Sequence, residues 1–285
     1  MPIGGILTAM VTPFDAAGRL DEGAAARLMR HLLDNGSDGL VLAGTTGEGA
    51  TLSDREKERL WELAVSEVGD EAVLIAGTGS NDTAHSIHLT ERAAEIGVDA
   101  ALVVTPYYNK PSRRGLIAHF SAVASAAPDL PVVLYNIPSR CVIDMDNELL
   151  AELAATIPNV RAVKQARYEH VAPIEGLDLL AGNDDMLADV LDLGGTGGIL
   201  VSSHLVGQEM RRMIDEPDVR HEIHNSLRDL FKAMFITSSP TPVKAALNMV
   251  GVAVGGLRLP LVDATEEEKA EIRAVLERHG LLTAV

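Results

Sequence analysis

The chain has 285 residues, of which 47% are hydrophobic, 23% are charged and only 3% are aromatic, a composition typical of a globular protein with an aliphatic core. Its formal net charge of −17 at pH 7 disfavours nucleic acid and anionic membrane surfaces as partners, because both repel an acidic protein. A small anionic substrate remains compatible with this charge, since a local cationic pocket can override the field of the whole molecule.

A single cysteine, Cys141, excludes an intrachain disulfide framework and a cysteine metal cluster. The first residues lack the basic and long apolar regions of a signal peptide. No apolar run approaches the length of about 18 residues that a spanning helix needs. We therefore expect a cytoplasmic protein without a membrane span.

Short aliphatic runs alternate with amphipathic segments along the first two thirds of the chain. Runs that are continuously aliphatic, rather than alternating with polar residues, are typical of strands buried on both faces of a parallel sheet. The sequence predicts eight such strands, at 5–11, 39–43, 72–76, 100–104, 132–135, 160–164, 177–181 and 198–201.

The segments between these strands have the spacing of amphipathic helices. Ser53 and Glu56, for example, have the three-residue separation of a capping box at the start of a helix. Between strands, helices are predicted at 22–34, 54–68, 82–96, 116–126, 147–156 and 185–193, with room for two helical turns at 169–176. Beyond the eighth strand, helices are predicted at 207–215, 221–235, 242–250 and 265–279.

Eight strand–helix repeats predict an α/β fold, namely a (β/α)8 TIM barrel over residues 1–205. Residues 206–285 are too helical to form a second domain with its own sheet, so we expect them to pack on the barrel as additional C-terminal helices. A doubly wound open sheet is the alternative, but no glycine motif of the nucleotide-binding type follows the first strand.

In a TIM barrel, the residues that follow each strand meet at one mouth, where active sites lie. These positions contain no cluster of histidines or carboxylates of the kind that binds metal, so no metal is expected. The mouth is expected to be poor in negative charge and to suit a substrate that bears a carboxylate. Its predicted polar side chains include Thr45, Thr46, Thr78, Tyr107, Tyr108, Tyr135, Arg140 and Lys164.

Lys164 stands at the end of the sixth predicted strand. Taken alone, a lysine more often extends to solvent or pairs with a carboxylate. Burial among hydroxyls and apolar groups would instead lower its pKa and make the amine a nucleophile. A neutral amine condenses with a ketone to an imine, and the protonated imine is an electron sink for making or breaking an adjacent C–C bond.

Three other groups at the mouth each allow two interpretations. The glycines that flank Thr45 and Thr46 let backbone N–H groups approach a carboxylate, but a capped tight turn accounts for the motif equally well. Tyr135, on the strand preceding that of Lys164, is interpreted as a proton shuttle rather than as a packed aromatic ring. Arg140 is either a surface ion-pair partner or a bidentate clamp for a carboxylate.

Four spaced motifs in this order resemble the dihydrodipicolinate synthase / N-acetylneuraminate lyase family: GTTGE at 44–48, TPYYNKPS at 105–112, YNIPSR at 135–140 and AVKQA at 162–166. The resemblance extends to GILTAMVTPF near the N-terminus and to SPTPVKAAL and LRLPL near the C-terminus. It implies a pyruvate-dependent class I aldolase on a TIM barrel with extra C-terminal helices, assembled as a tight dimer or a homotetramer.

The resemblance also implies how pyruvate is held. Lys164 would form a Schiff base with it, so neither a metal nor a separate organic cofactor is expected. Thr45 and Thr46 would hold the carboxylate, while Gly182 and Ile199 would line the pyruvate pocket with backbone groups.

Proton transfer and the second substrate are implied in the same way. Tyr135 would relay protons together with Thr46 and with Tyr108, which would be lent across a subunit interface. Arg140 resembles the residue of the synthase branch that binds the carboxylate of aspartate semialdehyde, in the synthesis of diaminopimelate and lysine.

Two alternatives remain beside the synthase. The segment QARYEH at 165–170 departs from the usual synthase sequence, so Arg167, Tyr168 and Glu169 are expected to alter the rim that receives the second substrate. A different pyruvate aldolase of the family, acting on a 2-keto-3-deoxy sugar acid or on N-acetylneuraminate, is the first alternative. A catalytically idle ligand-binding member is the second, which the intact site residues disfavour.

Feedback inhibition by lysine is expected to be weak or absent. Lys57 would repel an incoming amine, and both Lys57 and His85 replace groups that would favour one. In regulated relatives the resemblance places the lysine site at positions matching Gly49, Ala50, Asp54, Lys57, Asn81, His85 and Tyr107.

Overall fold

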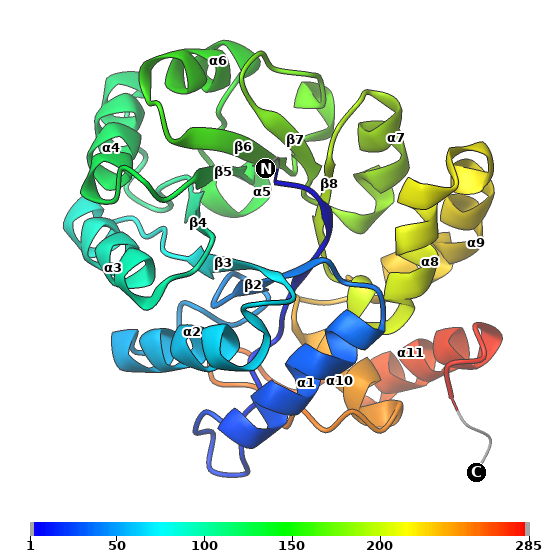
Figure 1. Ribbon diagram of the computed structural model, residues 1–285. Helices are drawn as coiled ribbons and strands as arrows, with labels where there is room; N and C mark the ends of the chain where they lie inside the picture. The colour runs from blue at the N-terminus through cyan, green and yellow to red at the C-terminus, as the bar shows by residue number, and fades with distance from the viewer. Residues whose placement is uncertain (1–2, 283–285) are drawn as a thin grey trace.

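Eight parallel strands pair in sequence order, and the last pairs with the first, which closes the barrel (Figure 1). The structure is a computed structural model, and it describes residues 3–282. All eight predicted strands are found, with ends that differ from the predicted ones by at most two residues. The strands are β1 Gly5–Ala9, β2 Gly39–Leu42, β3 Val73–Gly77, β4 Ala100–Val104, β5 Val132–Asn136, β6 Val160–Gln165, β7 Asp178–Ala181 and β8 Gly197–Leu200.

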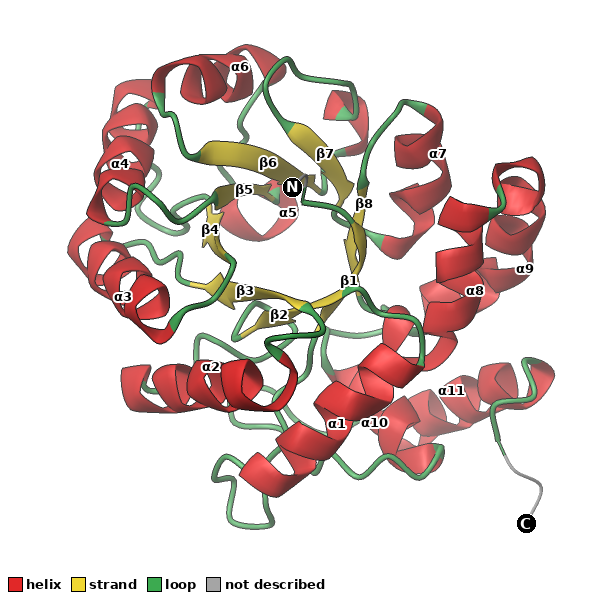
Figure 2. Cartoon of the chain, in the orientation of Figure 1, coloured by secondary structure: helices red, strands yellow, loops and turns green. Residues whose placement is uncertain are grey.

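The two faces of these strands belong to two separate apolar clusters, which explains their continuous aliphatic character. One cluster fills the barrel and includes Leu7, Val41, Ile75, Val133 and Leu180. The other lies between the strands and the surrounding ring of helices (Figure 2). Because both faces are buried, a polar strand residue at the mouth stands on a rigid support.

The helices begin where the sequence offers capping groups. The side chain of Asp21 accepts a hydrogen bond from the N–H of Ala24, and the predicted capping box of Ser53 and Glu56 is present. Between strands the helices are α1 Glu22–Asp34, α2 Asp54–Val68, α3 Thr83–Ile96, α4 Arg113–Ala126, α5 Pro138–Cys141, α6 Asn147–Thr156 and α7 Leu187–Asp192. The short 3₁₀ helices are η1 Tyr168–His170, η2 Asp184–Met186 and η3 Pro217–Val219.

The prediction of two helical turns at 169–176 is wrong. Only one 3₁₀ turn, η1, forms between β6 and β7. Pro173 lacks an N–H donor, and Gly176 has a positive φ of 83°, so the chain there cannot continue a helix. The short helix α5, which carries Arg140, was not predicted.

The C-terminal segment packs against the outside of the barrel on the side of α1 (Figure 1). The predicted boundary between residues 205 and 206 lies inside α8, a helix that packs on β1. Over the described range, no helix combines the length and the apolar character needed to cross a bilayer. The last helices are α8 Ser203–Asp215, α9 Arg220–Ala233, α10 Thr241–Met249 and α11 Glu266–Arg278.

Candidate active site

Lys164 is buried at the carboxyl end of β6, with only 5% of its surface exposed. The sheet register places it directly beside Tyr135 of β5 and Leu180 of β7. Its Nζ lies 4.3 Å from the centroid of the Tyr135 ring. The structure therefore brings the predicted lysine and phenol together and keeps the amine away from bulk water.

Burial dominates the ionisation of both groups. It lowers the pKa of Lys164 to about 7, with Asp184 opposing the change and Arg140 adding to it. A large share of the amine is consequently neutral near pH 7, as a nucleophile requires. Burial raises the pKa of Tyr135, while Arg140 and the side chain of Thr45 act in the opposite direction. The phenol thus stays protonated at neutral pH and can donate a proton.

The turn after β2 places the two predicted threonines at the barrel mouth. Thr46 is buried and Thr45 is exposed. The hydroxyl of Thr12 donates a hydrogen bond of 2.6 Å to the carbonyl of Gly47, which ties the turn to the segment after β1. A Cβ on Gly49 would lie 2.1 Å from the carbonyl oxygen of Ala43, so only glycine allows this close approach.

Arg140 stands on α5, directly after β5, and its side chain is exposed. Within residues 3–282 it forms no ion pair, although its positive charge acts on both Lys164 and Tyr135. Val142, just after α5, has a φ of 68°, which is unusual for a β-branched residue. An exposed guanidinium whose charge acts on a buried amine and phenol is suited to binding a carboxylate.

A cavity of about 480 Å³ is lined by Thr45, Tyr135 and Arg140, whereas Lys164 and Thr46 are not among its lining residues. The same cavity is also lined by Lys57, His85 and Tyr107, which belong to the predicted lysine site. The two predicted sites are therefore parts of one continuous space.

Lys57 and His85, the two residues expected to disfavour bound lysine, both lie near Asp54. Lys57 is 8% exposed, and burial lowers its pKa while Asp54 raises it. The Nε2 atom of His85 lies 2.8 Å from Oδ1 of Asp54, so this carboxylate is already engaged.

Tyr108, Gly182 and Ile199, the other predicted site residues, are not among the residues that line this cavity. Tyr108 is 88% exposed with a φ of 72°, and within one chain it does not join the cluster around Lys164. The N–H of Gly182 donates to the carbonyl of Gln165 at 2.8 Å, and a Cβ there would lie 2.7 Å from the same oxygen. Ile199 of β8 is 1% exposed and packs inside the barrel.

Asp184 is a buried carboxylate whose charge acts on Lys164, and the sequence interpretation gave it no role. It is 1% exposed, its Oδ1 accepts from the N–H of Val201 at 2.8 Å, and its Oδ2 accepts from the N–H and Oγ of Ser202. Burial raises the pKa of Asp184, while its hydrogen bonds from Ser202 and Val201 act in the opposite direction. Its place in the sequence indicated a position at the mouth, because Asp184 closely follows the seventh predicted strand.

The QARYEH segment forms a linked rim. Oε1 of Gln165 accepts hydrogen bonds from Asn136 on the neighbouring strand and from the N–H of Arg167. Arg167 and His170 both lie within ion-pair distance of Asp144, at 3.6 Å and 3.1 Å. Since Asp144 follows α5, this segment is connected to the loop after the helix that carries Arg140.

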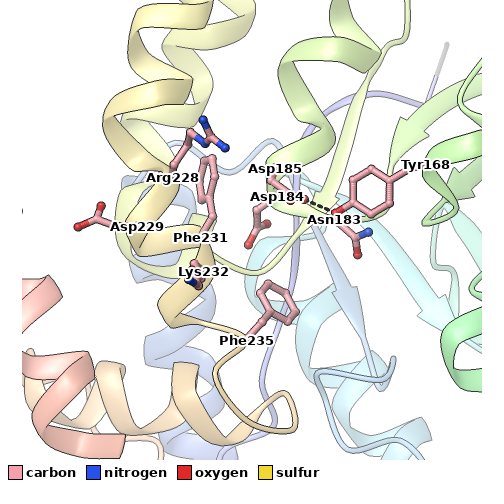
Figure 3. A pocket seen from close by; sticks show the side chains of 9 residues that line it. All are labelled: Tyr168, Asn183, Asp184, Asp185, Arg228, Asp229, Phe231, Lys232 and Phe235. Atoms are coloured by element: carbon pink, nitrogen blue, oxygen red, sulfur yellow. Dashed lines mark hydrogen bonds between the residues drawn. The ribbon is translucent and has the colours of Figure 1, made fainter.

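A second cavity, of about 540 Å³, lies between α9 and the loops after β6 and β7 (Figure 3). The hydroxyl of Tyr168 donates to Oδ1 of Asp185 at 2.7 Å across this space. The cavity is larger, but none of the predicted catalytic or substrate-binding residues lines it, so we assign the candidate active site to the first cavity. Its lining comprises Tyr168, Asn183, Asp184, Asp185, Arg228, Asp229, Phe231, Lys232 and Phe235.

Among residues 3–282, no three His, Cys, Asp or Glu side chains are grouped so that they could hold a metal ion.

Comparison with known proteins finds relatives over nearly the full length of the chain. The curated 4-hydroxy-tetrahydrodipicolinate synthase of Moorella thermoacetica is 48% identical, covering 99% of this chain and 100% of the relative. That of Desulforudis audaxviator is 46% identical, covering 98% of each chain. The crystal structure of DHDPS from Cyanidioschyzon merolae with lysine bound has a TM-score of 0.95 and 42% identity, covering 98% of this chain and 99% of that one. Residues 2–279 match the model of the Dihydrodipicolinate synthetase family, and the chain therefore belongs to this family.

Proposed function

We propose that the protein is a 4-hydroxy-tetrahydrodipicolinate synthase, a lyase that condenses pyruvate with aspartate semialdehyde. The observation that carries the proposal is Lys164, buried against Tyr135 with a pKa lowered to about 7. Full-length relatives at 42–48% identity bear this enzyme's name, which supports the same assignment.

The reaction begins at the neutral amine of Lys164, which attacks the ketone carbon of pyruvate. Loss of water gives a protonated imine, with Tyr135 supplying and accepting the protons. The threonine turn, Thr45–Thr46, holds the pyruvate carboxylate. Loss of a methyl proton then gives an enamine, because the imine accepts the electron pair.

The second half of the reaction uses the semialdehyde. Arg140 binds its carboxylate, and the enamine carbon attacks its aldehyde carbon to form the new C–C bond. The amino group of the bound semialdehyde then attacks the imine carbon and displaces Lys164, which closes the ring and releases the product. The lysine itself is the electron sink, so the proposed reaction uses neither a metal nor an organic cofactor.

Assembly is part of the proposal. Tyr108 is exposed on a loop in the left-handed backbone region, a conformation that persists where surrounding contacts hold it. A second copy of the chain would provide those contacts and receive Tyr108 into its proton relay. We propose a cytoplasmic tight dimer or homotetramer that serves diaminopimelate and lysine synthesis.

Arg140→Ala is expected to raise the KM for aspartate semialdehyde about 10- to 100-fold, because a charge-assisted hydrogen bond contributes about 1.5–3 kcal/mol. Capture of pyruvate should change little, because the variant keeps Lys164 and the threonine turn. Arg140→Lys is the matched control, since it keeps the charge but loses the bidentate geometry, and an intermediate KM is expected.

Steady-state assays with the semialdehyde, run beside assays with 2-keto-3-deoxy sugar acids and N-acetylneuraminate, check this prediction. Turnover confined to the sugar acids would favour the other aldolase activity. An unchanged KM for the semialdehyde in Arg140→Ala would remove Arg140 from the second-substrate site.

Free lysine is expected to inhibit weakly or not at all. Lys57 lines the cavity, where its positive charge would repel the amine of lysine, and Asp54 is engaged by His85. Initial rates measured over a range of lysine concentrations, with sodium chloride at equal ionic strength as the control, test this expectation. A micromolar inhibition constant would contradict it.

A further inference from the structure

The last residue of the GTTGE motif, Glu48, has no place in the reaction described above, yet its side chain is completely buried. The side chains of Glu48 and Lys244 of α10 are 0% and 1% exposed, and Lys244 Nζ lies 2.6 Å from Oε1 of Glu48. An ion pair removed from water in this way gives up several kcal/mol of solvation per charge. Stability alone is a poor explanation for it, because apolar groups of the same shape often serve as well.

Further contacts hold the carboxylate of Glu48 and the ammonium of Lys244 in position. Oε2 of Glu48 accepts from the N–H of Arg258 at 3.0 Å, and Lys244 Nζ donates to the carbonyl of Gly256 at 2.7 Å. The Lys244 ammonium and the Arg258 guanidinium each lie 4.2 Å from the centroid of the Phe14 ring. The segment after α10 is thereby joined to the loops after β1 and β2.

Glu48 also belongs to the threonine turn through its backbone. Its N–H donates to the carbonyl of Thr45 at 3.1 Å, and its φ is 53°. Left-handed backbone is uncommon outside glycine and persists where the surrounding structure over-determines it. A displacement of the Glu48 side chain would therefore be transmitted to Thr45 and Thr46.

We infer that Lys244, acting through Glu48, is a positioning residue that holds the Thr45–Thr46 turn in the geometry that receives the pyruvate carboxylate. The inference rests on the proposed function, since it assigns the turn to pyruvate. It gives the C-terminal helices a role in substrate binding, because α10 supplies the cation that the turn requires.

Three variants separate positioning from simple stabilisation: Lys244→Met, Glu48→Gln and the double variant. Lys244→Met leaves a buried carboxylate without its cation and should lower the Tm most, while the double variant removes both charges and should recover much of that loss. The KM for pyruvate is expected to rise about 10-fold in Lys244→Met and to remain raised in the double variant. The kcat should change less than about 3-fold.

If the KM for pyruvate recovers together with the Tm in the double variant, the pair only stabilises the fold and the inference is overturned. An unchanged KM in all three variants would also overturn it. If Lys244→Met does not accumulate as folded protein, the KM and the Tm are compared between the double variant and Glu48→Gln instead. Lys269→Met is the control, because Lys269 of α11 pairs with Glu266 at the surface, and neither its KM nor its Tm should change. Borohydride trapping of the wild-type protein with pyruvate distinguishes failure of the proposed function from failure of this inference. Absence of an adduct would refute the Lys164 imine. An adduct together with unchanged KM values in the variants would refute only the positioning role of Lys244.

Discussion

Replacement of Lys164 with methionine is expected to abolish turnover and, at pH 7, to make the protein more stable. Methionine has a similar length and no charge, so it fills the site without the solvation cost of an ammonium. In the proposed mechanism, the wild-type protein bears that cost because the reaction needs an amine at this position. A nucleophile that raises activity and lowers stability is a direct sign of a functional site.

The pH dependence of this effect follows from the two pKa values. In the unfolded chain Lys164 is protonated below its ordinary pKa of 10.5, whereas in the folded protein it is protonated only below about 7. The destabilisation is therefore complete below about pH 7 and disappears as the pH rises toward 10.5. The full difference corresponds to about 5 kcal/mol, and relaxation around the charge makes about 2–4 kcal/mol the expected gain at pH 7.

Urea unfolding of wild type and Lys164→Met at pH 7 and at pH 9.5 measures the effect. The advantage of the variant should be large at the lower pH and smaller at the higher one. Lys269→Met, at an exposed lysine, should show no such difference. A Lys164→Met protein that is less stable than wild type at pH 7 would contradict the burial of an amine with a lowered pKa.

Tyr135→Phe is expected to lower kcat about 10²- to 10⁴-fold, the range that positioned acid–base groups contribute. The ring would still pack beside Lys164, so the variant removes the proton donor and little else. The KM for pyruvate should change only slightly, because the threonine turn remains. Steady-state kinetics with both substrates check this, and a kcat within about 5-fold of wild type would remove Tyr135 from the proton relay.

The strands could be predicted from the sequence because burial on both faces of a closed parallel barrel leaves long aliphatic runs. Helices with a local capping signal, such as α2 with Ser53 and Glu56, were predicted with similar accuracy. Lys164 and Tyr135 could be placed together, since neighbouring strands of a barrel end at one mouth and the register aligns these two residues.

Features that depend on distant contacts could not be predicted. Lys244 lies nearly 200 positions after Glu48, and nothing in the pattern of either segment indicates that they pair. The single turn of η1 and the helix α5 are shorter than the periodicity of a sequence can resolve. Asp184 was visible at a strand end, but its hydrogen bonds to the loop after β8 appear only in three dimensions.

The most direct test of the central claim is mass spectrometry of the protein after borohydride reduction in the presence of pyruvate. A covalent pyruvate adduct on a single peptide, mapped to Lys164 and absent from Lys164→Met, is the expected result. Protein that remains unmodified, or an adduct located on another lysine, would contradict the account of Lys164 as the amine that captures the keto acid.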